Sequence, residues 1–264
     1  MVTGGLLEKV LQSADFAGFS AGWHEADVVP TGFAPLDRLL PAGGVRRGSL
    51  VEWLSSGEAS GATALAAAVA CRLAGDADHA GDSSSTIVVV DRKGRFYPPA
   101  VLGWLERARV AGRPVPRLVV ARPAHEADEV WAIDQALRCH GVAAVVAWPA
   151  GIHSTAMRRW QLAARASLAV GMFMRPLAAQ REPSWAEARV AVSARPGGSA
   201  GVRWLRLSLA GGPWAGESQM QERSVDVGLD LARGCAATSG PTSPAQPSSA
   251  PRILERERMA CRAS

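Results

Sequence analysis

This sequence has no long apolar runs, no closely spaced cysteine pair and very little lysine. No run approaches the roughly 20 apolar residues that a membrane-spanning helix needs, and the first residues lack the layout of a signal peptide. We therefore expect a cytoplasmic protein with no membrane partner. The mean hydropathy of +0.04, with 48% hydrophobic residues, indicates a globular chain with a proper core.

Four cysteines are scattered along the chain without a CxxC pair, which argues against disulfides and against zinc ligation. Cys71 and Cys139 fall on apolar helical stretches, so we expect buried thiols there. No two of the five histidines have the i, i+4 spacing of a helical metal pair. The sequence thus predicts no metal site, and no Ser/His/Asp set can be assigned from it. The other two cysteines are Cys235 and Cys261.

Lysine occurs only as Lys9 and Lys93, so 27 of the 29 basic residues are arginines. The net charge of +5 and the pI near 9.6 are compatible with a nucleic-acid partner. The arginines are spread along the whole chain, however, as a compositionally biased genome would also produce. The charge therefore permits such a partner without assigning one.

Between Gly48 and about Ala210, short β-branched runs alternate with helical patterns, which is typical of an α/β fold with a mostly parallel sheet flanked by helices. The near-continuous hydrophobicity of the runs fits strands that are covered on both faces. After them, 202–210 alternates with period two and predicts an antiparallel ending. The expected strands are 49–54, 86–91, 117–122, 142–148, 168–174 and 188–196, and the expected helices are 63–73, 98–110, 124–139 and 154–166.

This pattern divides the chain into three parts: an N-terminal helical or irregular segment (1–29), a core domain (30–210) and a flexible tail (211–264). The loop at 75–85 is long for a helix-to-strand connection. In the tail, 238–252 is rich in proline and serine and cannot bury enough surface to fold alone. The charged end at 253–261 either becomes a helix on a partner or stays solvated.

The stretch LSSGEASGATAL (54–65) has the outline of a phosphate-binding loop between a strand and a helix. Against the pattern GxxxxGK[ST], Gly61 and Thr63 match, while Ser56 and Ala62 replace the first glycine and the lysine. A Gly/Ser-rich turn of this kind also occurs in α/β proteins that bind no phosphate. The remnant consists of Ser56, Gly57, Glu58, Ser60, Gly61, Ala62 and Thr63.

The wider segment PTGFAPLDRLLPAGGVRRGSLVEWLSSGEASGATAL (30–65) resembles the start of the ATPase core of RecA-like recombinases. Within it, Thr31 can cap a short helix. The resemblance implies a catalytic lysine at Ala62, a water-activating acid at Lys93 and a magnesium-ordering aspartate at Trp148. None of the three is present. We therefore expect a pseudo-ATPase with a degenerate phosphate loop, no catalytic residue and no bound cofactor.

The family's two DNA-contacting loops also look reduced, to 149–153 and 175–187. Over 30–210 the chain most resembles the ImuA family, the RecA-like proteins of a bacterial DNA-damage-inducible mutagenesis cassette. The matching stretches are 117–148, 157–176 and the β ending after 188. The resemblance implies a non-catalytic accessory protein in translesion synthesis. It would contact an ImuB-like, polymerase-related partner, with RecA as a further candidate and DNA contact only indirect.

Two other functions stay open at this point. A SulA-like inhibitor of cell division is the regulatory alternative, and a residual DNA-dependent ATPase is the enzymatic one.

Aromatic and basic residues leave two smaller alternatives. Tryptophans in the predicted helices (Trp104, Trp131 and Trp160) are expected in the core rather than as a platform for bases. Trp148 either fills the position of the absent magnesium site or simply packs there. A second group forms either a basic strip or an ordinary solvated face: Arg92, Lys93, Arg95, Arg158 and Arg159.

Overall fold

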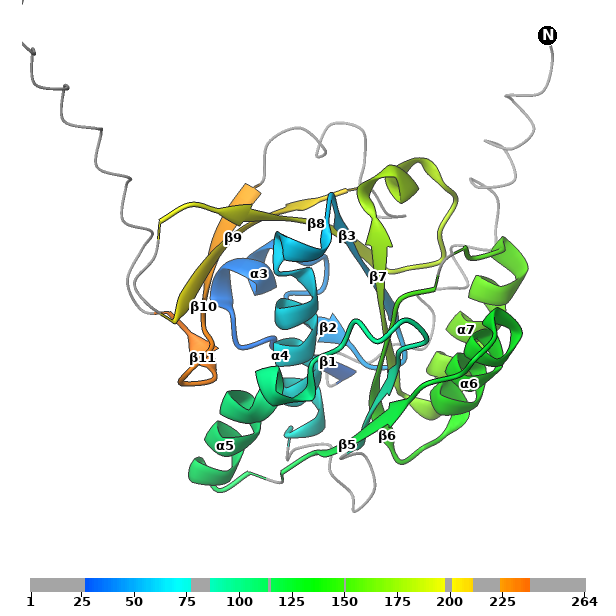
Figure 1. Cartoon of the computed structure of the whole chain (residues 1–264), viewed down its shortest axis with the longest axis horizontal. Coiled ribbons are helices and arrows are strands. Elements are labelled where there is room, and N and C mark those ends of the chain that lie inside the picture. Colours follow the sequence, from blue (N-terminus) through cyan, green and yellow to red (C-terminus); the bar gives the residue numbers. More distant parts are fainter. Residues whose placement is uncertain are drawn as a thin grey trace, which may run out of the picture.

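One mixed sheet organises the protein (Figure 1). The computed structural model describes residues 27–76, 86–113, 115–149, 151–197, 201–210 and 224–237. Within these ranges the strand order is β11-β10-β9-β8-β3-β7-β6-β4-β5, parallel from β8 to β5 and antiparallel from β8 to β11. The strands are β3 (Leu50–Ser55), β4 (Thr86–Val90), β5 (Arg117–Ala121), β6 (Val142–Ala147), β7 (Val170–Pro176), β8 (Ala188–Arg195), β9 (Val202–Leu209), β10 (Ser224–Asp230) and β11 (Cys235–Ala236).

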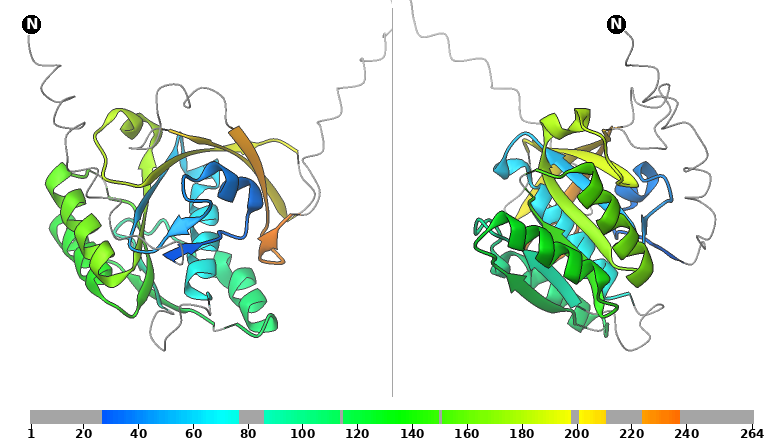
Figure 2. Two further views of the ribbon diagram at one scale, coloured as in Figure 1. Left: turned by 180° about the vertical axis from the view of Figure 1, so that it is seen from behind. Right: turned by 90° about the vertical axis from the view of Figure 1, so that its right-hand side faces the viewer.

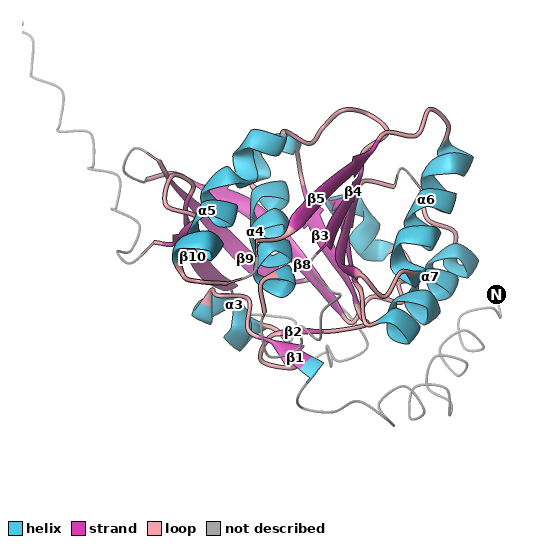
Figure 3. Cartoon of the chain, turned by 90° about the horizontal axis from the view of Figure 1, so that it is seen from below, coloured by secondary structure: helices cyan, strands magenta, loops and turns pink. Residues whose placement is uncertain are grey.

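Helices cover both faces of the sheet, as the apolar strands require (Figure 3). The helices α4 (Ala62–Ala74) and α5 (Leu102–Val110) lie on one face, and α6 (Glu126–Arg138) and α7 (Ser154–Ser167) lie on the other. The α/β fold with a mostly parallel sheet and an antiparallel ending is therefore as the sequence predicts.

Strand β3 lies between the parallel strands β7 and β8 and faces two separate cores. Val51 and Trp53 pack in the core under α4, whereas Leu50 packs in the core under α6 and α7. Alternate residues of a strand point to opposite faces, which accounts for this division. Helix α4 is rich in alanine and is buried on most of its surface, in the curve formed by β8, β9 and β10 (Figure 1).

The start of the described chain forms a small unit inside the same curve (Figure 2). Strands β1 (Val28–Val29) and β2 (Val45–Arg46) pair, and α3 (Ala34–Leu39) contacts β9 and β10. The prediction that Thr31 caps α3 is wrong, because the N-cap is Phe33. Thr31 acts from two residues upstream: its hydroxyl accepts a hydrogen bond from the Phe33 amide and donates one to Asp37.

Three boundaries differ from the sequence-based expectation. The sheet continues beyond residue 210 into the segment assigned to the tail, because β10 and β11 add to the edge at β9. Strand β7 starts at Val170 rather than at 168, since Leu168 has φ +65° and ends α7. The helix expected at 98–110 is a 3-10 turn, η4 (Pro98–Val101), followed by α5.

Several predictions lie outside the described residues: those on residues 1–26, on most of the loop at 75–85 and on the C-terminal segment from 238 onward. Among the described helices, none has the length and apolar character to span a membrane.

Candidate functional site at the end of β3

A cleft of about 470 Å³ lies at the carboxyl ends of β3, β4, β6 and β7, and we call it the β3-end cleft. It brings together the three positions that the resemblance singles out. Ala62 is the first residue of α4, Lys93 follows β4, and Trp148 follows β6. The other lining residues are Ser55, Ser56, Gly57, Ser60, Thr63, Arg95, Pro149, Met174, Arg175 and Pro176.

The loop between β3 and α4 is held by its own backbone and by β9. A 3-10 turn, η2 (Glu58–Ser60), precedes Gly61, whose φ of +87° starts α4. A Cβ atom at Gly61 would lie 2.5 Å from Leu205 of β9, so this close approach requires glycine. The guanidinium of Arg203 donates a hydrogen bond to the Ala59 carbonyl oxygen, and the Ala62 amide donates to Ser60 Oγ at 3.3 Å. One amide that a phosphate would need thus already has an acceptor.

The carboxylate closest in sequence to Lys93 is used for the loop itself. Asp91 is buried, and its two oxygens accept hydrogen bonds from the Arg95 amide (2.9 Å) and the Phe96 amide (2.8 Å). This arrangement shapes the turn that presents Lys93. Lys93 is exposed and makes no hydrogen bond or ion pair with any other described residue.

Trp148 fills the end of β6 with an indole. Its side chain is almost wholly buried, and its ring lies 6.4 Å from that of Phe96, centroid to centroid. The residue therefore has apolar packing on one side and the cleft on the other. Both roles that the sequence leaves open, packing and occupation of the position of the absent aspartate, are compatible with this placement.

The charged residues among the described lining of the β3-end cleft are all basic. Its lining includes Lys93, Arg95 and Arg175, and none of the described lining residues carries a carboxylate. Magnesium requires oxygen ligands, usually one or two carboxylates, and activation of an attacking water requires a base. The residues present therefore do not fit a magnesium–nucleotide, and no phosphoryl-transfer step follows from them. What they can do is attract an anion without a metal ion.

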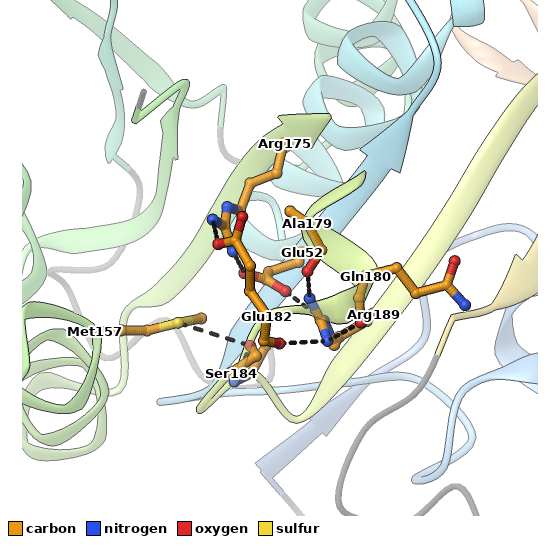
Figure 4. Close-up of polar contacts among 9 residues, drawn as sticks. Glu52, Met157, Arg175, Ala179, Gln180, Glu182, Ser184 and Arg189 are labelled. Atoms are coloured by element: carbon orange, nitrogen blue, oxygen red, sulfur yellow. Dashed lines mark hydrogen bonds and ion pairs between the residues drawn. The ribbon is translucent and has the colours of Figure 1, made fainter. Parts of the chain in front are cut away.

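Directly behind the cleft lies a buried ionic cluster (Figure 4). Glu52, in the middle of β3, is fully buried between two arginines: Arg175 at 2.8 Å and Arg189 at 2.5 Å. Arg175 also pairs with the more exposed Glu182 at 2.5 Å. Burial alone would lower the pKa of Arg175, but Glu52 and Glu182 outweigh it and raise the pKa above its ordinary value.

This cluster also fixes the segment expected as a shortened DNA loop, 175–187. Arg189 donates hydrogen bonds to three carbonyl oxygens of that segment, those of Ala179, Gln180 and Glu182. Residues Leu177–Arg181 form a 3-10 helix, η5. The segment is thus a well-bonded part of the fold rather than a long free loop.

The proposed basic strip does not form as a run of unpaired cations. Arg92 pairs with Glu129 at 2.9 Å, and Arg159 pairs with Asp134 at 2.8 Å. Arg158 donates to Gln161 and lies 4.4 Å from the centre of the Trp185 ring. Ion pairs and packing therefore account for these three arginines, which favours the solvated-face interpretation.

Two expectations about buried side chains are wrong in part. Trp104 and Trp160 lie in the core, but Trp131 is 64% exposed because it lies on the outer side of α6. Cys71 is buried, whereas Cys139 is exposed at the end of α6. Burial raises the pKa of Cys71 to about 12.

Sequence patterns do not identify some residues of the buried cluster and of the cleft. Glu52 in the apolar strand LVEWLS is the one sign of the cluster that the sequence offers, because a buried glutamate needs a charged or hydrogen-bonding partner. Its partners stand 123 and 137 positions away, so no local pattern identifies them. Arg175, at the end of β7, is likewise a cleft residue without a motif.

Among the described residues, no group of three or more histidine, cysteine or acidic side chains could hold a metal ion. No protein-family model matches the chain, and no curated protein sequence does either.

Proposed function

We propose that this protein is a RecA-like, ImuA-type accessory factor without ATPase activity, which acts through protein contacts during damage-induced translesion synthesis. The observation that carries the proposal is the meeting of Ala62, Lys93 and Trp148 in one cleft whose described lining residues include no carboxylate. These are the positions where a RecA-like ATPase would carry its lysine, its base and its magnesium ligand.

The relation to RecA-like cores is supported by the placement of the strand ends. β4 and β6, the second and fourth core strands, are direct neighbours, and β6 is separated from β3 by β7 alone. This order allows residues from the ends of the second and fourth strands to reach a loop at the end of the first. The resemblance selects the three positions from sequence alone, and their convergence gives it a geometric basis.

The chemistry of the cleft favours the accessory function over a residual ATPase. Phosphoryl transfer depends on positioned charges around the transferred group and its metal ion. The described lining residues offer cations and hydroxyl groups, but no carboxylate that could act as the base or complete a magnesium site. In addition, the bonded segment at 175–187 leaves little of a DNA-binding loop, so we propose that DNA is reached through partners. The proposed partner is an ImuB-like protein, with RecA as a further candidate, in the cytoplasm.

Two measurements on the full chain test this function. We expect ATP hydrolysis in the presence of magnesium and single-stranded DNA to equal that of a no-protein control. Turnover that disappears in the Thr63→Ala variant would instead establish a working ATPase. We also expect the chain to co-purify with an ImuB-like protein when the two are co-expressed. Binding to the tubulin-like division protein, without binding to the ImuB-like protein, would favour the SulA-like alternative.

A further inference from the structure

A second pocket, of about 430 Å³, lies far along α4 from the β3-end cleft, and we call it the basic-rimmed pocket. It is lined by the second half of α4, by α5, by the segment before α3 and by the turn into β11. In Figure 1 these parts meet around the blue-green α5 and the orange β11. None of its lining residues belongs to the β3-end cleft.

The wall formed by the β10–β11 turn is built by a backbone-to-backbone contact. Gly234 has φ +61°, and a Cβ atom there would lie 2.1 Å from the carbonyl oxygen of Gly103 on α5. Asp230 accepts a hydrogen bond from the Arg233 amide at 2.9 Å and so closes the same turn. The pocket is therefore a preformed part of the fold, with its wall held against the helix.

The floor of the pocket is apolar and aromatic. Phe33 and Trp104 are almost fully buried and meet edge to face, with ring centroids 5.9 Å apart. Ala68 of α4 adds to this floor. An apolar side chain that entered the pocket would gain contact area against two aromatic groups.

The rim is basic. Arg72, Arg107 and Arg113 line it, and no described lining residue carries a carboxylate. Arg72 forms an ion pair with Asp76 at 3.8 Å. The side chains of Arg107 and Arg113, in contrast, form no hydrogen bond or ion pair with any other described residue. Arg107 lies in the last turn of α5, and Arg113 follows the end of the helix, just after Gly112 with φ +67°. Two guanidinium groups that have no carboxylate partner in the described part of the chain, at separate points of the rim, suit more than one carboxylate.

We infer that the basic-rimmed pocket binds an acidic peptide segment of a partner protein, with one apolar side chain on the Phe33–Trp104 floor and flanking carboxylates on Arg107 and Arg113. A small inorganic anion would leave the floor uncovered, and an uncharged apolar ligand would leave the arginines without counter-charge. The inference goes beyond the proposed function and does not depend on it, because it concerns the chemistry of the ligand and no particular pathway.

The test uses the full chain and a fluorescent synthetic peptide, Glu-Glu-Leu-Phe-Glu-Glu, in an anisotropy titration. We expect saturable binding that weakens about tenfold or more in the double variant Arg107→Glu/Arg113→Glu, because each exposed pair is lost and replaced by repulsion. Arg181→Glu is the matched control: Arg181 is exposed, lines neither pocket, and its substitution should leave peptide affinity unchanged. Ala111→Trp, which narrows the pocket mouth, should weaken binding without changing its charge.

Cys235 locates the binding independently, since its half-buried thiol lines the pocket. Saturating peptide should slow maleimide labelling of Cys235, while buried Cys71, with its pKa near 12, stays unlabelled throughout. The inference is overturned if the wild-type chain does not bind the peptide, if a Gln-for-Glu peptide binds equally well, or if the double variant keeps full affinity. Displacement of the peptide by a short oligothymidylate would assign the pocket to nucleic acid instead.

Discussion

The β3-end cleft and the buried cluster behind it share Arg175, but they differ in whether their cations are paired with carboxylates. In the cluster, Glu52 neutralises two arginines in the interior of the protein. In the cleft, by contrast, Lys93 forms no ion pair with any other described residue, and no described lining residue carries a carboxylate. Among the described side chains, Glu52 therefore serves the fold, and no carboxylate lines the cleft. Charges at the first place should therefore control stability, and those at the second should not.

The strongest test of this difference is Glu52→Ala. Removing the carboxylate leaves two buried guanidinium groups without their shared partner, so we expect a loss of about 3–5 kcal/mol in the free energy of unfolding. Denaturant titration measures it. Lys93→Ala, at the exposed rim of the cleft, is the control and should change the same quantity by less than about 0.5 kcal/mol. Similar losses in both variants would remove the distinction between the two regions.

Asp91 is a second carboxylate with a structural role, because it holds the turn after β4. In Asp91→Ala the amides of Arg95 and Phe96 lose their acceptor, and the variant should be about 2–4 kcal/mol less stable. Chymotryptic cleavage after Phe96 should also become faster, because the turn is no longer held. Wild-type stability and cleavage would show that the turn forms without the carboxylate.

A smaller effect is expected at Asp134, whose carboxylate lies between Arg138 and Arg159, both half-exposed. Burial alone would raise the pKa of Asp134, but the two arginines outweigh it and lower the pKa below the ordinary 3.8. The ionised group thus contributes stability that is fully present above that value and is lost as the pH falls through the lowered pKa. Asp134→Asn should cost about 1 kcal/mol at neutral pH and progressively less in acid. A cost independent of pH would contradict this origin.

The smallest effect is expected for a substitution in the cleft itself. Ala62→Lys introduces the lysine that the proposed RecA-like relation would require, yet we expect ATP turnover to remain at background, because the described lining has no carboxylate to act as a base or to complete a magnesium site. A coupled spectrophotometric assay would measure it. Strong turnover in this single variant would mean that Lys93 and Trp148 do not occupy the positions assigned to them.

Sequence patterns sufficed for the parallel part of the sheet, because strands such as VAAVVA are apolar on both faces and helices separate them. β10 was missed although Val225, Val227 and Leu229 alternate with smaller or polar residues, which is a usable period-two signal. It lies in a stretch that otherwise resembles a linker.

The site was predictable only where a motif existed. The three positions of the β3-end cleft follow from the loop pattern and the strand ends. The basic-rimmed pocket does not, since its wall depends on the contact between Gly103 and Gly234, which are 131 positions apart in the chain. Contacts of this range arise from the assembled sheet and leave no local pattern.

The placement of β3 between β7 and β8 also has a consequence for biosynthesis. Leu50 pairs with Gly171, so the first long strand of the sheet acquires its nearest partner only about 120 residues later. At synthesis rates of about 5–20 residues per second, LVEWLS would wait roughly 6–24 s after leaving the ribosome. During that interval an apolar strand with both edges unpaired is open to aggregation. A ribosome-associated chaperone that binds this segment would therefore raise the yield of the folded chain.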